Sequence, residues 1–123
     1  MSASITKNAV EKWHQMIENR DMSILSELLA DDVMFRSPVA FKPYEGKAVV
    51  FFILTNVIQV LQDFTYHREF YSEDGENAVL EFSANVSGKS LKGIDMIRFN
   101  EHGQIIDFEV MIRPMSGLAA LAE

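Results

Sequence analysis

The sequence predicts an α+β protein whose helices precede an antiparallel sheet. Two observations predict this class. Apolar residues recur three or four positions apart as far as Leu61, and the apolar period changes to two from Phe64 onward. Helices followed by a run of strands are typical of folds in which the helices cover one face of a sheet. Because 123 residues match the usual length of one domain, we expect a single domain over residues 1–123.

Three helices are expected first. From Ser4 to Asn19 one helical face is apolar, and Asp21 can cap a second helix that stops near Asp31-Asp32. A third helix, Ala48–Leu61, is apolar nearly all round, so we expect it to be buried against the sheet.

Strands follow the third helix. Residues Ala78–Val86 and Ile106–Ile112 alternate between apolar and polar side chains, as half-buried strands do. Asp74-Gly75 and Asn100–Gly103 lie between strand patterns, where hairpin turns favour residues that tolerate positive φ. A short helix over Leu118–Leu121 is expected to end the chain.

Composition excludes several classes of function. Nucleic-acid binding requires a basic face, and a net charge of −7 argues against such a face on this protein. We therefore expect no nucleic-acid partner. The absence of cysteine excludes disulfides, zinc–thiolate sites and thiol nucleophiles. Residues Ala48–Leu61 are too few to cross a bilayer, which needs ~20, and Met1–Val10 lacks the apolar segment of a secretory signal. We therefore expect a cytoplasmic protein without nucleic-acid or membrane partners.

Asp95 is the polar residue that best indicates a site. In Leu91–Phe99 the odd-numbered residues form an apolar face on which Asp95 is the only charge. A carboxyl in such a place is either neutral with a raised pKa or held by hydrogen-bond donors. One alternative stays open, because Ile94 and Met96 would let the opposite face be the buried one.

The other polar candidates indicate less. Ser37 shares an apolar face with Phe35, but no nucleophile elbow surrounds it, so we expect a hydroxyl satisfied by the backbone. Trp13 is either a core residue or a donor of its indole N–H into a cavity. The dispersed histidines lack metal-ligand spacing, and the sequence contains no phosphate loop or dinucleotide fingerprint. No metal and no cofactor are therefore expected.

Four segments resemble the nuclear transport factor 2-like superfamily, in its SnoaL-like and ketosteroid isomerase-like branch. They are Leu29–Pro38, Gly46–Ala48, Gly93–Asn100 and Gly103–Ile105. The resemblance implies a cone-shaped, curved antiparallel sheet with three N-terminal helices closing a cavity. It also implies a homodimer formed through the outer face of the sheet.

The resemblance also implies which positions of this sequence correspond to the catalytic residues of ketosteroid isomerases. The base of ketosteroid isomerases falls on Ser37 before Pro38, their tyrosine falls on Trp13, and their protonated acid falls on Asp95. Since serine has no usable basicity near neutral pH, isomerisation by that mechanism is not expected. Polyketide cyclases of this fold use a cavity aspartate, a role that Asp95 could fill. The Asp–Arg–Asp set of the fold's epoxide hydrolases is not expected, because Asp95 and Arg98 face opposite sides of their strand.

Three hypotheses follow. The leading one is a protein that binds a small hydrophobic molecule in an apolar cavity, with Asp95 as its polar group. The second is an isomerase- or cyclase-type enzyme with Asp95 as acid or base. The third is an interaction module whose outer sheet face, with Ile94, Met96 and Met111, docks a partner. The expected cavity wall is Trp13, Phe35, Ser37, Phe52, Phe82, Asp95, Ile97, Phe108, Val110 and Ile112.

Overall fold

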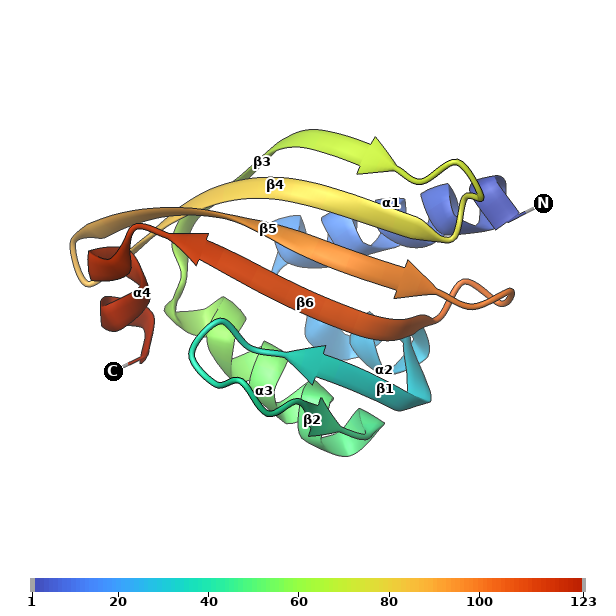
Figure 1. The fold of residues 1–123 in the computed structure, drawn as a ribbon, viewed down its shortest axis with the longest axis horizontal. Coiled ribbons are helices and arrows are strands. Elements are labelled where there is room, and N and C mark those ends of the chain that lie inside the picture. Colours follow the sequence, from blue (N-terminus) through green and yellow to red (C-terminus); the bar gives the residue numbers. More distant parts are fainter. Residues whose placement is uncertain (1, 123) are drawn as a thin grey trace.

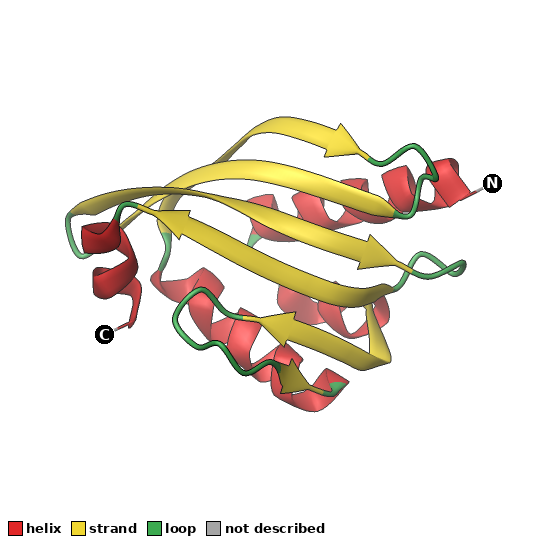
Figure 2. Cartoon of the chain, in the orientation of Figure 1, coloured by secondary structure: helices red, strands yellow, loops and turns green. Residues whose placement is uncertain are grey.

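The computed structural model describes residues 2–122, and in it a curved sheet lies over helices (Figure 1). The α+β class is confirmed (Figure 2). In chain order the elements are α1 (Ser2–Asn19), η1 (Met22–Ile24), α2 (Leu25–Leu28), β1 (Leu29–Arg36), β2 (Tyr44–Glu45), α3 (Lys47–Val60), β3 (Gln62–Tyr71), β4 (Asn77–Val86), β5 (Lys89–Phe99), β6 (Ile105–Arg113) and α4 (Met115–Ala122).

The expected first helix is confirmed, and its apolar face, which includes Trp13, is buried in the core. The second helix is shorter than expected. Asp21 caps η1 by accepting a hydrogen bond from the backbone N–H of Ser23 at 3.1 Å, but α2 ends at Leu28. Residues 29–32, expected to be helical, begin β1, because Leu29 pairs with Ile105 of the last strand. Tertiary pairing thus overrides the helical spacing of this segment.

The six strands form one mixed sheet in the order β2-β1-β6-β5-β4-β3. The expectation of a fully antiparallel sheet is wrong at one pair, because β1 and β6 run parallel. Alternation within a strand identifies the strand and its buried face but does not identify its neighbour. Strand β3 carries two irregularities in its register with β4, and such bulges increase local twist and bending. The sheet therefore curves around the helices.

Helix α3 buries only one of its faces. Val50, Leu54 and Ile58 are buried, whereas Val49 and Phe52 are exposed on the other side. The helix is therefore buried, as expected, but on one face only. A helix that is apolar on every side gives no periodic signal of which face turns inward.

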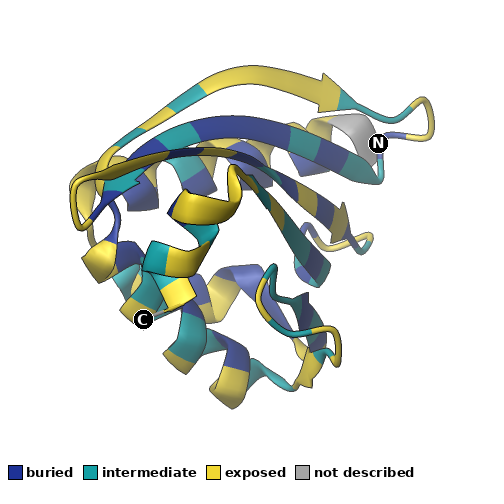
Figure 3. Ribbon diagram, turned by 60° about the vertical axis from the view of Figure 1, so that its left-hand side comes forward, coloured by how far each residue is buried: buried dark blue, intermediate teal, exposed yellow. Residues whose placement is uncertain are grey.

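The inner face of the sheet forms the core with α1 and α3, and β4 is mostly buried while the edge strand β3 is mostly exposed (Figure 3). Helix α4 adds a fourth helix to the three expected to close the cavity. It packs closely on β5, because a Cβ added at Gly117 would lie 2.8 Å from the Cβ of Leu91. No helix within residues 2–122 combines the length and the apolar character that crossing a membrane requires.

Candidate functional site

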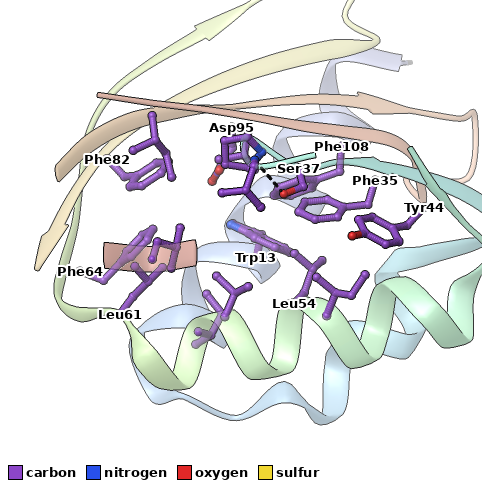
Figure 4. Close-up of a pocket in the computed structure, with 18 of the residues that line it drawn as sticks. Trp13, Phe35, Ser37, Tyr44, Leu54, Leu61, Phe64, Phe82, Asp95 and Phe108 are labelled. Atoms are coloured by element: carbon purple, nitrogen blue, oxygen red, sulfur yellow. Dashed lines mark hydrogen bonds between the residues drawn. The ribbon is translucent and has the colours of Figure 1, made fainter. Parts of the chain in front are cut away.

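A cavity of about 250 Å³ lies between the inner face of the sheet and the helices. Figure 4 shows Phe82, Asp95 and Phe108 reaching into it from the strands, with Trp13 and Leu54 facing them from α1 and α3. The wall is almost entirely aromatic and aliphatic. It consists of Trp13, Phe35, Ser37, Pro38, Val39, Tyr44, Ile53, Leu54, Val57, Ile58, Leu61, Phe64, Tyr66, Phe82, Asp95, Phe108, Val110, Ile112 and Leu121.

Among the described residues of this wall, Asp95 carries the one carboxyl group. Strand β5 keeps an unbroken register with β4, so its odd-numbered residues from Leu91 to Phe99 turn inward and Asp95 is only 4% exposed. Burial in apolar surroundings disfavours the charged carboxylate and raises the pKa of Asp95 to about 7. A hydrogen bond from Tyr66 acts in the opposite direction and lowers this pKa in part. The carboxyl is therefore poised to gain or lose a proton near neutral pH.

Asp95 is the end of a chain of hydrogen bonds that starts on α1. The indole N–H of Trp13 donates to the hydroxyl oxygen of Tyr66 at 2.6 Å, and the Tyr66 hydroxyl donates to Oδ2 of Asp95 at 2.7 Å. Burial and the neighbouring Asp95 raise the pKa of Tyr66 well above its usual range. Tyr66 is therefore a neutral phenol near neutral pH.

The other oxygen of Asp95, Oδ1, differs from Oδ2 in its bonding. Within residues 2–122 the structure shows no hydrogen-bond partner for Oδ1. Oδ1 is not sealed off either, because in the same part of the chain the only fully buried side-chain oxygen or nitrogen without a partner is Oγ1 of Thr55. A ligand in the cavity can therefore reach Oδ1.

Ser37 contributes the other small polar group of the wall. Its hydroxyl oxygen accepts a hydrogen bond from the backbone N–H of Val39 at 3.1 Å, in the turn that follows β1. This is the backbone-satisfied serine expected from the sequence. The hydroxyl proton of Ser37 stays free to donate, but no base among the described residues is bonded to it that could make it a nucleophile.

The structure brings most of the expected wall together. Two expected residues lie elsewhere: Phe52 is 69% exposed on the outer side of α3, and Ile97 is 1% exposed within the core cluster. Ile97 shares the inner face of β5 with Asp95, but it packs against other core side chains instead of bordering the cavity. The expected residues that line the cavity are Trp13, Phe35, Ser37, Phe82, Asp95, Phe108, Val110 and Ile112.

Sequence reasoning missed Tyr66, the direct partner of Asp95. Phe64 and Tyr66 do alternate, and this signal could have placed both on the inner face. The register irregularity between Tyr66 and Glu69 breaks the alternation immediately afterwards, so β3 has a mixed pattern. The remaining missed residues are Pro38, Val39, Tyr44, Ile53, Leu54, Val57, Ile58, Leu61, Phe64 and Leu121.

The histidines lie outside the cavity wall. His67 shares a hydrogen bond with the Ser83 hydroxyl at 2.8 Å, and His14 contacts the carboxylate of Glu69. Over the described residues, no three histidine or acidic side chains lie close enough together to hold a metal ion.

The profile of the SnoaL-like domain matches residues 10–108, most of the chain. This protein belongs to the SnoaL-like family. The suspected nuclear transport factor 2-like superfamily is thereby confirmed, and the curved, unclosed sheet matches that superfamily's cone. Among curated proteins there is no significant match to the chain.

Solved structures similar to this SnoaL-like protein include a steroid delta-isomerase from Pseudomonas aeruginosa. It is 54% identical, with a TM-score of 0.94 over 96% of this chain and 86% of that one. An uncharacterized protein with a cystatin-like fold from Silicibacter pomeroyi is 34% identical, with a TM-score of 0.86 over 93% of this chain and 79% of its own. SalBIII, an epoxide hydrolase/cyclase-like enzyme of salinomycin pyran-ring formation, is 15% identical with a TM-score of 0.78, over 95% of this chain and 97% of that chain. At that identity it shares the fold alone.

Proposed function

We propose that this SnoaL-like protein binds a small, mostly apolar molecule that carries one oxygen function, with Asp95 as its polar contact. The observation that carries the proposal is a single carboxyl, with one oxygen unpartnered among the described residues, in a cavity wall that is otherwise almost entirely aromatic and aliphatic. Small-molecule sites usually have this composition, in which apolar side chains supply affinity and few polar groups fix orientation.

The volume of the cavity limits the size of the ligand that it can enclose. Drug-sized molecules occupy pockets of roughly 300–1,000 Å³. A volume of about 250 Å³ lies below that range and favours a molecule of one or two rings. A larger ligand would have to leave part of itself outside the cavity.

A second function, proton transfer catalysed by Asp95, is supported by two observations. General acids and bases work best when their pKa lies near the operating pH, and the pKa of Asp95 is raised to about 7. The relative from Pseudomonas aeruginosa, 54% identical, is a steroid delta-isomerase. In this reaction the Asp95 carboxylate takes a proton from the carbon next to a ligand carbonyl. It returns that proton two carbons further along, so the double bond moves and no atom is gained or lost.

The first experiment is a thermal-shift panel of enones, phenols and terpenoid epoxides, each with one or two rings. A ligand at 100 times its Kd adds about 2.7 kcal/mol to the free energy of unfolding, which a domain of this size reports as a rise in Tm of several degrees. A reproducible rise for one class supports binding and names the compounds for turnover assays. If no class raises the Tm, the binding proposal is wrong.

The second experiment separates binding from catalysis. Conversion of cyclohex-3-enone to cyclohex-2-enone is followed by the absorbance of the conjugated product. We expect Asp95→Asn to abolish turnover while ligand binding persists, because asparagine keeps the shape of the side chain but cannot take up the proton. Glu81→Gln, which changes a carboxyl on the outer face, is the matched control and should keep turnover. Equal turnover in wild type and Asp95→Asn would exclude Asp95 as the acid or base.

We also infer a homodimer formed through the outer face of the sheet. The exposed side chains Phe70, Met96 and Met111 support this, because large apolar side chains on one face of a sheet are typical of a contact surface. Light scattering coupled to size exclusion should give twice the chain mass for the wild type and a single chain mass for Met96→Asp. A monomeric wild type at high concentration would contradict the dimer.

A further inference from the structure

We propose that Trp13 and Tyr66 are positioning residues that determine which oxygen of Asp95 meets the ligand, and that they thereby make the cavity distinguish a carbonyl ligand from the corresponding alcohol. This inference rests on the proposed function, because it assumes that a ligand oxygen contacts Asp95. It names a ligand class for the binding function, small cyclic ketones and enones. It also assigns a role to two side chains that do not carry the reacting proton. In the proton-transfer reaction, by contrast with ligand binding, the Asp95 carboxylate would contact the carbon next to the carbonyl and not the carbonyl oxygen.

The hydrogen-bond chain has a fixed direction. An indole N–H can only donate, so the Tyr66 oxygen is the acceptor in the bond from Trp13. The single phenolic proton of Tyr66 then has one acceptor within reach among the described residues, which is Oδ2 of Asp95 at 2.7 Å. Each donor in the chain is used once.

This direction assigns different roles to the two carboxyl oxygens of Asp95. Oδ2 accepts from Tyr66, and a carbonyl-type oxygen accepts better than the oxygen of an acid O–H. When Asp95 is neutral, its proton therefore resides on Oδ1, the oxygen without a partner in the described part of the chain. Oδ1–H then donates to a ligand carbonyl. When Asp95 is ionised, Oδ1 becomes an acceptor that repels a carbonyl oxygen and binds a hydroxyl.

Among the described residues that line the cavity, the two tyrosines are the ionisable side chains besides Asp95. The strand neighbours of Asp95 are Leu80 on β4 and Val110 on β6, and both are apolar. Trp13 is the partner from α1 and Tyr66 the partner from β3.

One ionisable pair lies beside the Tyr66 ring, outside the cavity. His14 packs edge-on against this ring, with the two ring centroids 4.6 Å apart, and contacts Glu69. Neither His14 nor Glu69 belongs to the cavity wall. A pH-dependent change of ligand preference therefore reports on Asp95.

The test compares 1-tetralone with 1-tetralol, which share one carbon skeleton and differ in their oxygen. Dissociation constants are measured from about pH 5.5 to about pH 8.5 by calorimetry with the full-length protein. We expect the ketone to bind with constant affinity below the titration of Asp95 and to lose about tenfold per pH unit above it. The alcohol should hold its affinity, so the preference inverts. A ketone that binds equally well at both ends of the range would overturn the proposal.

Two variants test the positioning role. Tyr66→Phe removes the donor to Oδ2, which stabilises the ionised form, so the pH of inversion should rise by about one to two units. Trp13→Phe weakens the Tyr66 donor indirectly and should move the inversion in the same direction by less. Tyr44→Phe is the matched control, because Tyr44 is the other tyrosine of the wall and has no hydrogen bond to Asp95. Its inversion should stay at the wild-type pH.

A measurement without ligand separates this inference from the proposed function. The Asp95 carboxyl carbon is titrated by NMR in wild type, Tyr66→Phe and Trp13→Phe. If neither tetralone nor tetralol binds but the Asp95 midpoint rises in the variants, the relay exists and only the ligand assignment fails. If both variants titrate like the wild type, the positioning role is wrong. Should Tyr66→Phe not fold, Trp13→Phe and the wild-type inversion still decide the question.

Discussion

Asp95 and Glu81 are carboxyl groups on neighbouring strands of one sheet, similarly hidden from solvent, yet their pKa values move in opposite directions. Glu81 faces outward from β4 and is 7% exposed. Its oxygens accept two hydrogen bonds from Arg68, at 2.8 and 2.7 Å, and form an ion pair with Lys92, which together lower its pKa to about 2. Asp95 faces inward at 4% exposure, meets one neutral donor, and has a pKa raised to about 7.

The comparison shows that partners, rather than burial alone, decide the state of a hidden carboxyl. Two cations, Arg68 on β3 and Lys92 on β5, hold Glu81 of β4 in its charged form. These ion pairs link the three strands. Among the described residues Asp95 has one hydrogen-bond partner, the phenol of Tyr66. This phenol donates to Oδ2 and leaves Oδ1 open to the cavity. The outer carboxyl serves the structure, and the inner one is available for chemistry.

The largest expected effect is on Asp95→Asn, as a change in the pH dependence of stability. Because the folded-state pKa is raised from 3.8 to about 7, the folded protein holds a proton that the unfolded chain has lost between these pH values. Wild-type stability therefore falls as pH rises through this window, by on the order of 4 kcal/mol at 1.36 kcal/mol per unit of pKa. Asparagine has no such proton, so urea unfolding should show the variant gaining on wild type from pH 4 to pH 8. Parallel pH profiles would contradict the raised pKa.

A smaller effect is expected for Gly93→Ala, which tests the close packing beside Asp95 on the inner face. A Cβ on Gly93 would overlap the backbone oxygen of Met111 and lie 2.8 Å from the ring of Phe82. Since the obstacle is backbone, we expect a destabilisation of about 1–3 kcal/mol in urea unfolding. Lys89→Ala, at the exposed start of β5, is the control and should unfold like the wild type. If Gly93→Ala has the same free energy of unfolding as the wild type, β5 and β6 can move apart at this point without loss of stability.

The smallest effect, of opposite sign to that at Asp95, is expected for Glu81→Gln. A lowered folded-state pKa gives stability that is present above pH 4.5 and is lost as pH falls toward about 2. The variant should therefore be less stable than wild type at pH 7, and the gap should narrow at pH 3, as measured by Tm. A gap that stays constant with pH would mean that Glu81 contributes through packing and not through its charge.

The sequence predicts the part of the site that lies on regular strands. Asp95 stands out because β5 alternates without interruption along its pairing with β4. Tyr66 does not stand out, since the irregularity beyond it in β3 hides which residues turn inward. The prediction that Phe52 lines the cavity is wrong for a different reason. The sequence of a helix that is apolar on all sides does not indicate which face is buried.

The same distinction applies to the fold. Most helices and long strands follow from local periodicity, but the boundary between α2 and β1, the short strand β2 and the mixed strand β3 do not. The parallel pairing of β1 with β6 joins segments from opposite halves of the chain. Such a pairing is decided by how whole layers pack, so no short window of sequence contains it. The direction of the Trp13–Tyr66–Asp95 chain depends in turn on that packing.

Trp13 is the only tryptophan in the sequence, and its indole is at once part of the cavity wall and the first donor of the hydrogen-bond chain. The emission of an indole responds to its hydrogen bonds and to the polarity around its ring. The protein therefore contains its own optical probe, in the wall of the cavity and one hydrogen bond away from Tyr66, the partner of Asp95. Intrinsic fluorescence of the unlabelled chain reads out the state of this one cavity, without background from a second tryptophan.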